Sequence, residues 1–279
     1  AFLLADTKHD DPLYRAREIT VTGIDGTEWQ LLTAPSWPLF NLSMDETLDL
    51  PRRMAEMAGL GSEFDVWNAV LPYTLNALGA FQIQEHITRR DEELGADKTQ
   101  RASAPPQMFA PSTRHYSWPK AAAVVGVGMK GLGDIPVDER ARQCLSGENG
   151  LEAQLRHCRE KRIPVLMTVA VIGSTEEGAV DPLADILALR DSVREMGQDF
   201  NIHADAAWGG YMISAIRRDY RFEGAPEEAE SDPDLPPYSA DSPFIDDYTE
   251  VPLSDYVVGQ YRALPRTDSI TMDPHKMGY

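Results

Sequence analysis

The sequence has 279 residues, of which 42% are hydrophobic and 25% charged, so it is long enough for one large globular domain or two small ones. Its 45 acidic and 26 basic side chains give a net charge of −19, which excludes partners rich in phosphate, such as nucleic acids and anionic membranes. No apolar run approaches the roughly 20 residues of a membrane span, and the first residues lack the pattern of a signal peptide. Cys144 and Cys158 have neither metal-ligand nor redox spacing, which predicts a cytoplasmic protein without disulfides.

Residues 1–110 are expected to form a mixed, largely helical part. Asp25-Gly26 lies between two short apolar stretches, at 19–24 and 29–32, and this pattern predicts a hairpin. Apolar spacing and polar composition predict three further segments: helices at 44–57 and 64–87, and an exposed connection at 88–106.

Residues 111–279 show the rhythm of an α/β sheet. Apolar, β-branched runs predict four strands, at 121–127, 163–172, 200–206 and 269–272. Apolar residues between Leu183 and Met196 mark one face of a helix, and the strand–helix–strand order around them implies parallel pairing with a right-handed crossover. An acidic, proline-bearing stretch at 223–252 predicts a surface loop. We therefore expect an α/β fold, with helices on both faces of a mainly parallel sheet.

Three predicted strands are followed by polar or small residues, at 173–175, 203–210 and 268–276. Ligands of parallel sheets collect at the carboxyl ends of the strands, so these segments are expected to meet at one site. Each segment alone has an ordinary explanation as a turn, a helix cap or a solvated surface lysine. Together they offer the groups that pyridoxal phosphate needs: an amine for an imine bond (Lys276), a carboxylate for the pyridine nitrogen (Asp205), and hydroxyl donors (Ser174 and Thr175).

The order of these motifs resembles group II pyridoxal-phosphate-dependent amino-acid decarboxylases, which include aromatic amino acid, tyrosine, histidine and glutamate decarboxylases. His203-Ala-Asp205-Ala-Ala207-Trp-Gly-Gly and the later Asp273-Pro-His275-Lys276 carry the resemblance, together with the stretch 111–122 and the turn 172–183. It implies a fold-type I large domain with a sheet of the seven-stranded type, present here in incomplete form. The expected division is an N-terminal part of that domain at 1–110 and a cofactor-binding part at 111–279.

The resemblance also implies site residues and chemistry. The expected reaction is decarboxylation of an L-amino acid, aromatic and tyrosine-like, through a Schiff base on Lys276 and a quinonoid intermediate. Lys276, Asp205 and His115, which would stack on the pyridine ring, are the expected catalytic residues. The cofactor would contact these three and four further residues, namely Ser174, Thr175, Ala207 beside the ring and His275 at the phosphate. No metal is expected, and the family resemblance implies a homodimer.

Other readings stay open. Aminotransferases, aldolase-type lyases and oxidative deaminases use the same lysine and aspartate, and a non-catalytic dimerising scaffold or inactive fragment is a third class. The family's Gly-Gly-Thr phosphate turn is not found, because Gly23 to Thr27 is better explained by the hairpin. The chain also stops three residues after Lys276, so we expect a piece of a larger polypeptide whose missing ends lie on another segment or chain. His203 is expected either to support Asp205 or to be a buried histidine without a direct role, and Asp273 is expected to cap a turn.

Overall fold

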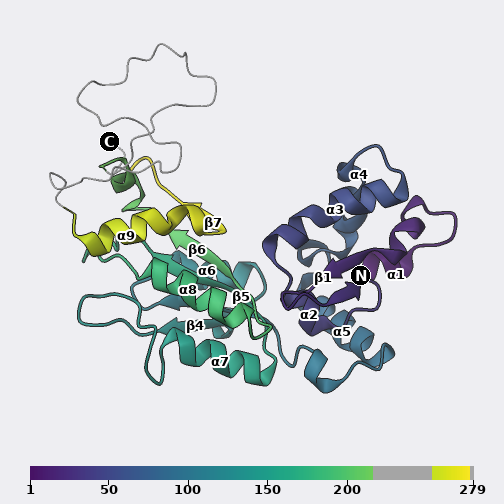
Figure 1. Cartoon of the computed structure of the whole chain (residues 1–279), viewed down its shortest axis with the longest axis horizontal. Coiled ribbons are helices and arrows are strands. Elements are labelled where there is room, and N and C mark those ends of the chain that lie inside the picture. Colours follow the sequence, from purple (N-terminus) through teal and green to yellow (C-terminus); the bar gives the residue numbers. More distant parts are fainter. Residues whose placement is uncertain (216–252, 277–279) are drawn as a thin grey trace, which may run out of the picture.

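The computed structural model describes residues 1–215 and 253–276, in which a helical N-terminal part lies beside an α/β part (Figure 1). Its helices are α1 (Phe2–Asp6), α2 (Ser36–Phe40), α3 (Met44–Ala58), α4 (Glu63–Val70), α5 (Leu75–Glu93), α6 (Ser117–Val124), α7 (Leu151–Lys161), α8 (Leu183–Arg194) and α9 (Asp255–Ala263). Short 3-10 turns lie at Pro12–Glu18, Leu71–Tyr73, Lys98–Gln100, Met129–Gly131, Gly210–Ala215 and Leu264–Arg266. No helix among the described residues is long and apolar enough to cross a membrane.

A parallel sheet forms the centre of the α/β part. Its strands are β3 (Gln107–Pro111), β4 (Leu132–Ile135), β5 (Val165–Val171), β6 (Asn201–Asp205) and β7 (Ser269–Thr271). They pair in the order β4-β3-β5-β6-β7, and every pair is parallel. The predicted α/β class and the predicted β5–α8–β6 unit are confirmed. Among the described residues this sheet has five strands rather than the seven of the expected type.

Helices cover both faces of this sheet. Helices α7, α8 and α9 pack on one face, where Leu155, Leu187 and Tyr261 belong to the largest buried cluster. Helix α6 packs on the other face, where Ala122 meets Met108 and Val169. Coverage on both faces explains why β5 is apolar without alternation.

Helix α6 corrects one prediction, because residues 121–127 had been expected to form a strand. The three alanines from Ala121 to Ala123 favour a helix, and Pro119 lies in its first turn, where a missing N–H costs no hydrogen bond. The connection between the parallel strands β3 and β4 also requires a crossover, which α6 provides. Gly126, with φ of 80°, then turns the chain back toward β4.

The N-terminal part confirms the hairpin, formed by β1 (Thr20–Thr22) and β2 (Glu28–Gln30), and the helix predicted at 44–57. The helix predicted at 64–87 is instead divided into α4 and α5 by a 3-10 turn containing Pro72, and α5 is kinked at Gly79 (φ 75°). The connection expected at 88–106 is also partly wrong. Helix α5 continues to Glu93, and the buried Asp91 carboxylate accepts the Ser36 backbone N–H at 2.9 Å.

The carboxyl ends of three strands lie at one level, which positions the site. Val171 of β5 pairs with Asp205 of β6, and Asp205 pairs with Thr271 of β7. The residues that follow these strands therefore emerge together at one edge of the sheet, as the sequence predicted. The division at residues 110 and 111 stays a prediction, and it falls inside β3. The loop predicted at 223–252 lies outside the described residues.

Asp181 fixes the chain where it leaves β5. Its carboxylate accepts the backbone N–H groups of Val171 and Gln143 at 2.7 Å each, and only 1% of the residue is exposed. Burial is the largest influence and raises the pKa of Asp181 to about 7, although the two N–H donors act in the opposite direction. A carboxyl that is hard to ionise thus lies beneath the edge that carries the site.

We expect Asp181→Asn to change how stability depends on pH. With a raised pKa, the folded wild type binds more protons than the unfolded chain between about pH 4 and pH 7, so its unfolding free energy falls as pH rises through that window. The Asn variant lacks this fall, so its stability relative to wild type should improve toward pH 7. Urea titrations at several pH values measure the trend. In the exposed control Asp97→Asn the opposite trend is expected, because the hydrogen bond from the Thr99 hydroxyl lowers the pKa of Asp97. If the unfolding free energies of wild type and Asp181→Asn changed with pH in parallel, the raised pKa of Asp181 would be contradicted.

Candidate active site

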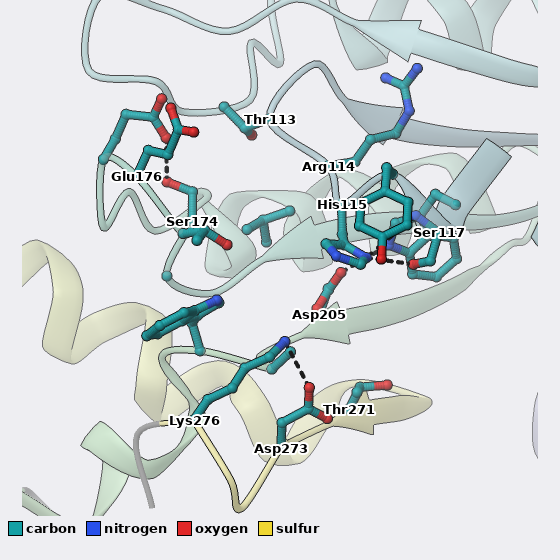
Figure 2. A pocket seen from close by; sticks show the side chains of 18 of the residues that line it. Thr113, Arg114, His115, Ser117, Ser174, Glu176, Asp205, Thr271, Asp273 and Lys276 are labelled. Atoms are coloured by element: carbon teal, nitrogen blue, oxygen red, sulfur yellow. Dashed lines mark hydrogen bonds and ion pairs between the residues drawn. The ribbon is translucent and has the colours of Figure 1, made fainter. Parts of the chain in front are cut away.

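A cavity of about 840 Å3 opens at the carboxyl edge of the sheet. Segments that follow β3, β5, β6 and β7 line it, and these segments are far apart in the sequence. Figure 2 shows the Lys276 and Asp205 side chains directed into the same space, with His115 beside Asp205. Six of the seven predicted site residues line this cavity, namely His115, Ser174, Thr175, Asp205, Ala207 and Lys276. Their roles in chemistry stay predictions.

Lys276 is anchored by Asp273. The Lys276 Nζ atom lies 2.7 Å from Asp273 Oδ2 and 6.0 Å from the centre of the Trp208 ring. The hydrogen bond from Lys276 is the largest influence on the pKa of Asp273 and lowers it. Asp273 had been expected to cap a turn; its carboxylate instead forms this ion pair, while its backbone carbonyl accepts the Lys276 N–H at 3.1 Å.

Asp205 receives a hydrogen bond from a residue to which the sequence assigned no role. The Trp118 Nε1–H donates to Asp205 Oδ2 at 2.8 Å, from the first turn of α6 to the end of β6. His203 lies on the same face of β6 but hydrogen bonds with hydroxyls of β7: its Nδ1 is 2.8 Å from Ser269 Oγ, and its Nε2 is 3.2 Å from Thr271 Oγ1. Burial lowers the pKa of His203, which favours the neutral ring.

His115 follows β3 and is held by its own turn. Its Nδ1 lies 2.8 Å from Ser117 Oγ, and its ring is tilted against Tyr116 with centroids 4.1 Å apart. The ring is exposed to the cavity, as a residue that covers a flat ligand must be. The predicted partner His275 is exposed and is not among the residues that line the cavity, so its contact with a phosphate stays a prediction.

The turn after β5 forms the opposite wall. The Ser174 hydroxyl donates to Glu177 Oε2 at 2.8 Å and accepts the Ala179 N–H at 3.0 Å, so it stabilises its own turn. Thr175 is exposed to the cavity. Gly173 and Gly209 allow this turn to cross the turn after β6, because a Cβ on Gly209 would lie 2.3 Å from the Ile172 carbonyl oxygen.

A family model described as the pyridoxal-dependent decarboxylase conserved domain matches residues 73–231, more than half of the sequence. The chain belongs to this family. It is 36% identical over 177 residues to an L-tyrosine decarboxylase of Enterococcus faecium, a match that covers 62% of the chain and 26% of that enzyme. It is 38% identical over 106 residues to an aspartate 1-decarboxylase of Aliivibrio fischeri, covering 38% of the chain and 18% of that enzyme. The chain thus spans about a quarter of the length of the tyrosine decarboxylase.

Among solved structures, tryptophan decarboxylase of Catharanthus roseus in complex with L-tryptophan aligns with a TM-score of 0.38 and 19% sequence identity. That alignment covers 68% of the chain and 29% of the tryptophan decarboxylase. The family resemblance carried by the sequence motifs is confirmed by the family match, and with it the expected cofactor, pyridoxal phosphate.

The cavity of this decarboxylase-family chain fits that cofactor. It offers an amine at Lys276 and a carboxylate at Asp205, and its volume lies in the range of small-molecule sites. The Thr113 hydroxyl, which lines the cavity, is buried and has no hydrogen-bond partner among the described residues. A buried hydroxyl of this kind is satisfied by a ligand acceptor such as a phosphate oxygen. Sequence reasoning overlooked Thr113, although the residue lies in the stretch that carried the resemblance.

We expect Gly209→Ala to lower the unfolding free energy by about 1–3 kcal/mol. The new Cβ would overlap the Ile172 carbonyl oxygen, and this backbone atom can move only if the strand end moves with it. Gly259→Ala in α9 is the matched control. No atom lies within 4 Å of its Cβ, and Ala in a helix should stabilise by about 0.5–1 kcal/mol. Urea denaturation of wild type and both variants measures the unfolding free energies. Equal midpoints for Gly209→Ala and wild type would show that the two turns have room for a Cβ at this position.

Proposed function

We propose that this chain carries the cofactor-binding half of the active site of a pyridoxal-phosphate-dependent amino-acid decarboxylase. The supporting observation is that the Lys276 amine and the Asp205 carboxylate converge on one cavity at the carboxyl edge of the sheet, in a chain of this family. The reaction is the release of CO2 from an L-amino acid to give the amine.

Pyridoxal phosphate, when bound, supplies a ring system that accepts the electron pair left when a bond at the substrate α carbon breaks. Lys276 holds the cofactor through its Nζ atom. Asp205 keeps a proton on the pyridine nitrogen, because a carboxylate favours a neighbouring cation. These two side chains set the direction of the ring within the cavity, and the orientation of the substrate follows from it.

The remaining wall residues shape the site around these two. His115 covers one face of the ring, and the small side chain of Ala207 leaves room beside it. The free Thr113 hydroxyl and the exposed Thr175 are available to the phosphate, whereas Ser174 reaches it only if its hydrogen bond to Glu177 rearranges. The amine of Lys276 lies over the Trp208 ring, 6.0 Å from its centre.

The substrate that we infer has a neutral aromatic side chain, with tyrosine as the first candidate. Four carboxylates line the described cavity, namely Asp205, Asp273, Glu176 and Glu177. The lining guanidinium, that of Arg114, is already paired with Asp134. Once Lys276 is attached to the cofactor, no lysine or arginine of the described lining is free to receive a second carboxylate. The match to the enterococcal L-tyrosine decarboxylase, which covers 62% of the chain against 38% for the aspartate 1-decarboxylase, supports the same choice.

The complete enzyme that we propose is a cytoplasmic homodimer. Large apolar side chains are exposed on α4 and α5, including Phe64 (67% exposed) and Phe81 (75%). Exposed apolar surface of this kind is typical of an interface. The partner subunit, or a further segment of a longer polypeptide, would complete the cavity and contribute the phosphate turn that the sequence lacks.

We expect Lys276→Ala to abolish covalent attachment of pyridoxal phosphate. Wild type mixed with the cofactor should gain a visible absorbance band, and borohydride should fix the label on the protein, because an imine with a lysine amine is reducible. Lys130→Ala, at an exposed lysine away from the cavity, is the control and should label like wild type. Absorbance and intact mass measure the result. If wild type takes up no cofactor, the chain would instead be interpreted as a non-catalytic dimerising scaffold.

Substrate preference is tested by comparing kcat/KM for L-tyrosine and L-aspartate in the protein that contains this chain. We expect tyrosine to be preferred, and the double variant Glu176→Gln, Glu177→Gln to reduce that preference about fivefold, since one close charge pair near water is worth about 1 kcal/mol. Glu92→Gln, on α5 outside the cavity, is the control. A higher kcat/KM for aspartate in the wild type would contradict the proposed substrate class.

A further inference from the structure

Trp118 connects two segments that are 87 residues apart in the sequence. It lies in the first turn of α6, and its Nε1–H donates to Asp205 Oδ2 at 2.8 Å. Asp205 Oδ1 has no hydrogen-bond partner among the described residues, and Asp205 lines the cavity. One carboxylate oxygen is therefore occupied by the protein, and the other is left for a ligand.

The indole is itself firmly placed. Trp118 is half-buried against the cluster that contains Met108 and Ala122, and its ring meets the edge of His203 with centroids 5.3 Å apart. His203 is held in turn by the hydroxyls of Ser269 and Thr271. A rigid donor fixes the rotation of the carboxylate, which would otherwise be free to turn in an open cavity.

The chemistry of the donor matters as much as its place. An arginine or lysine here would neutralise Asp205 and weaken its attraction for a protonated ring nitrogen. An indole N–H is neutral and only donates, so it orients the carboxylate and leaves its full negative charge for a cation in the cavity. A tryptophan that served packing alone could donate its N–H to any nearby acceptor or to water, whereas this one donates to a carboxylate that lines the cavity.

We propose that Trp118 is a positioning residue for Asp205: it holds the carboxylate by one oxygen so that the other meets the protonated pyridine nitrogen of the cofactor. This inference rests on the proposed function, because it takes pyridoxal phosphate as the ligand of Asp205. It adds a residue that acts through Asp205 and not through the ligand.

Trp118→Phe tests the proposal, because it removes the N–H and keeps an aromatic ring. The dissociation constant of pyridoxal phosphate, titrated by absorbance, should rise about 10-fold, as expected for the loss of a hydrogen bond to a charged group. Trp37→Phe is the matched control. Trp37 is buried in the N-terminal part beside Arg162, and this variant should leave the dissociation constant unchanged.

A double-mutant cycle separates positioning from packing. In an Asp205→Asn background, Trp118→Phe should change cofactor affinity by less than about twofold, because the group through which Trp118 acts is already altered. An equal loss in both backgrounds would overturn the proposal, and so would an unchanged affinity of Trp118→Phe in a wild type that binds the cofactor. A wild type that binds no pyridoxal phosphate would instead overturn the proposed function, and the inference with it.

A second measurement needs neither cofactor nor a folded Trp118 variant. In the ligand-free wild type, the Trp118 indole proton should exchange slowly with solvent, and its NMR resonance should shift in Asp205→Asn while that of Trp37 stays in place. A rapidly exchanging Trp118 proton, or one that is indifferent to Asp205→Asn, would overturn the proposal.

Discussion

The two turns that follow β5 and β6 cross in backbone contact, and the cavity depends on this crossing. The Gly209 N–H donates to the Ile172 carbonyl at 3.0 Å, and the Gly209 carbonyl accepts the Tyr261 hydroxyl at 2.7 Å. Tyr261 belongs to α9, so this helix stabilises the point where the two turns cross. Because Gly173 and Gly209 leave no room for a Cβ, the two turns can approach only if both positions are glycine. The wall that carries Thr175 and the wall that carries Ala207 are thereby fixed relative to each other.

Lys276, the proposed imine-forming lysine, is restrained in this structure by the carboxylate of Asp273, three residues earlier. An ammonium group bound to a carboxylate is not a nucleophile, so attack on a carbonyl compound requires Lys276 to separate from Asp273 and lose a proton. The hydrogen bond from Lys276 is also the largest influence that lowers the pKa of Asp273, so the separation removes the main partner of that carboxylate. The turn that presents the amine thus contains, in Asp273, a carboxylate that opposes its reaction.

The sequence predicted those helices, strands and turns that are set by local residue patterns. The hairpin follows from Asp25-Gly26, and the β5–α8–β6 unit follows from apolar runs separated by a helical spacing. The apolar, β-branched run at 121–127 gave a wrong strand, because the alanines and the need for a crossover outweighed the valines that follow. The meeting of Asp205 and Lys276 in one cavity was predictable, because one ends a predicted strand and the other follows one in the same parallel sheet. The place of His115 came from the family resemblance instead, since β3 was not among the predicted strands. Trp118 and Thr113 were not, because a contact between Trp118 and Asp205 depends on how α6 packs across the sheet, and a hydroxyl without a partner is visible only in three dimensions.

The acidity of the chain bears on why the hydrogen-bond donor to Asp205 is a neutral indole. With a net charge of −19 and four carboxylates in the described lining, the cavity favours a cationic ring nitrogen, and Asp205 is one of several acidic groups that could attract it. A group that orients the Asp205 carboxylate should itself be uncharged, since an additional cation would compete with the ligand for Asp205. The indole N–H of Trp118 meets this requirement, and its helix begins directly after the turn that carries His115. The residue that orients the carboxylate and the residue expected to cover the ring are therefore placed by the same short segment, so a movement of α6 would disturb both together.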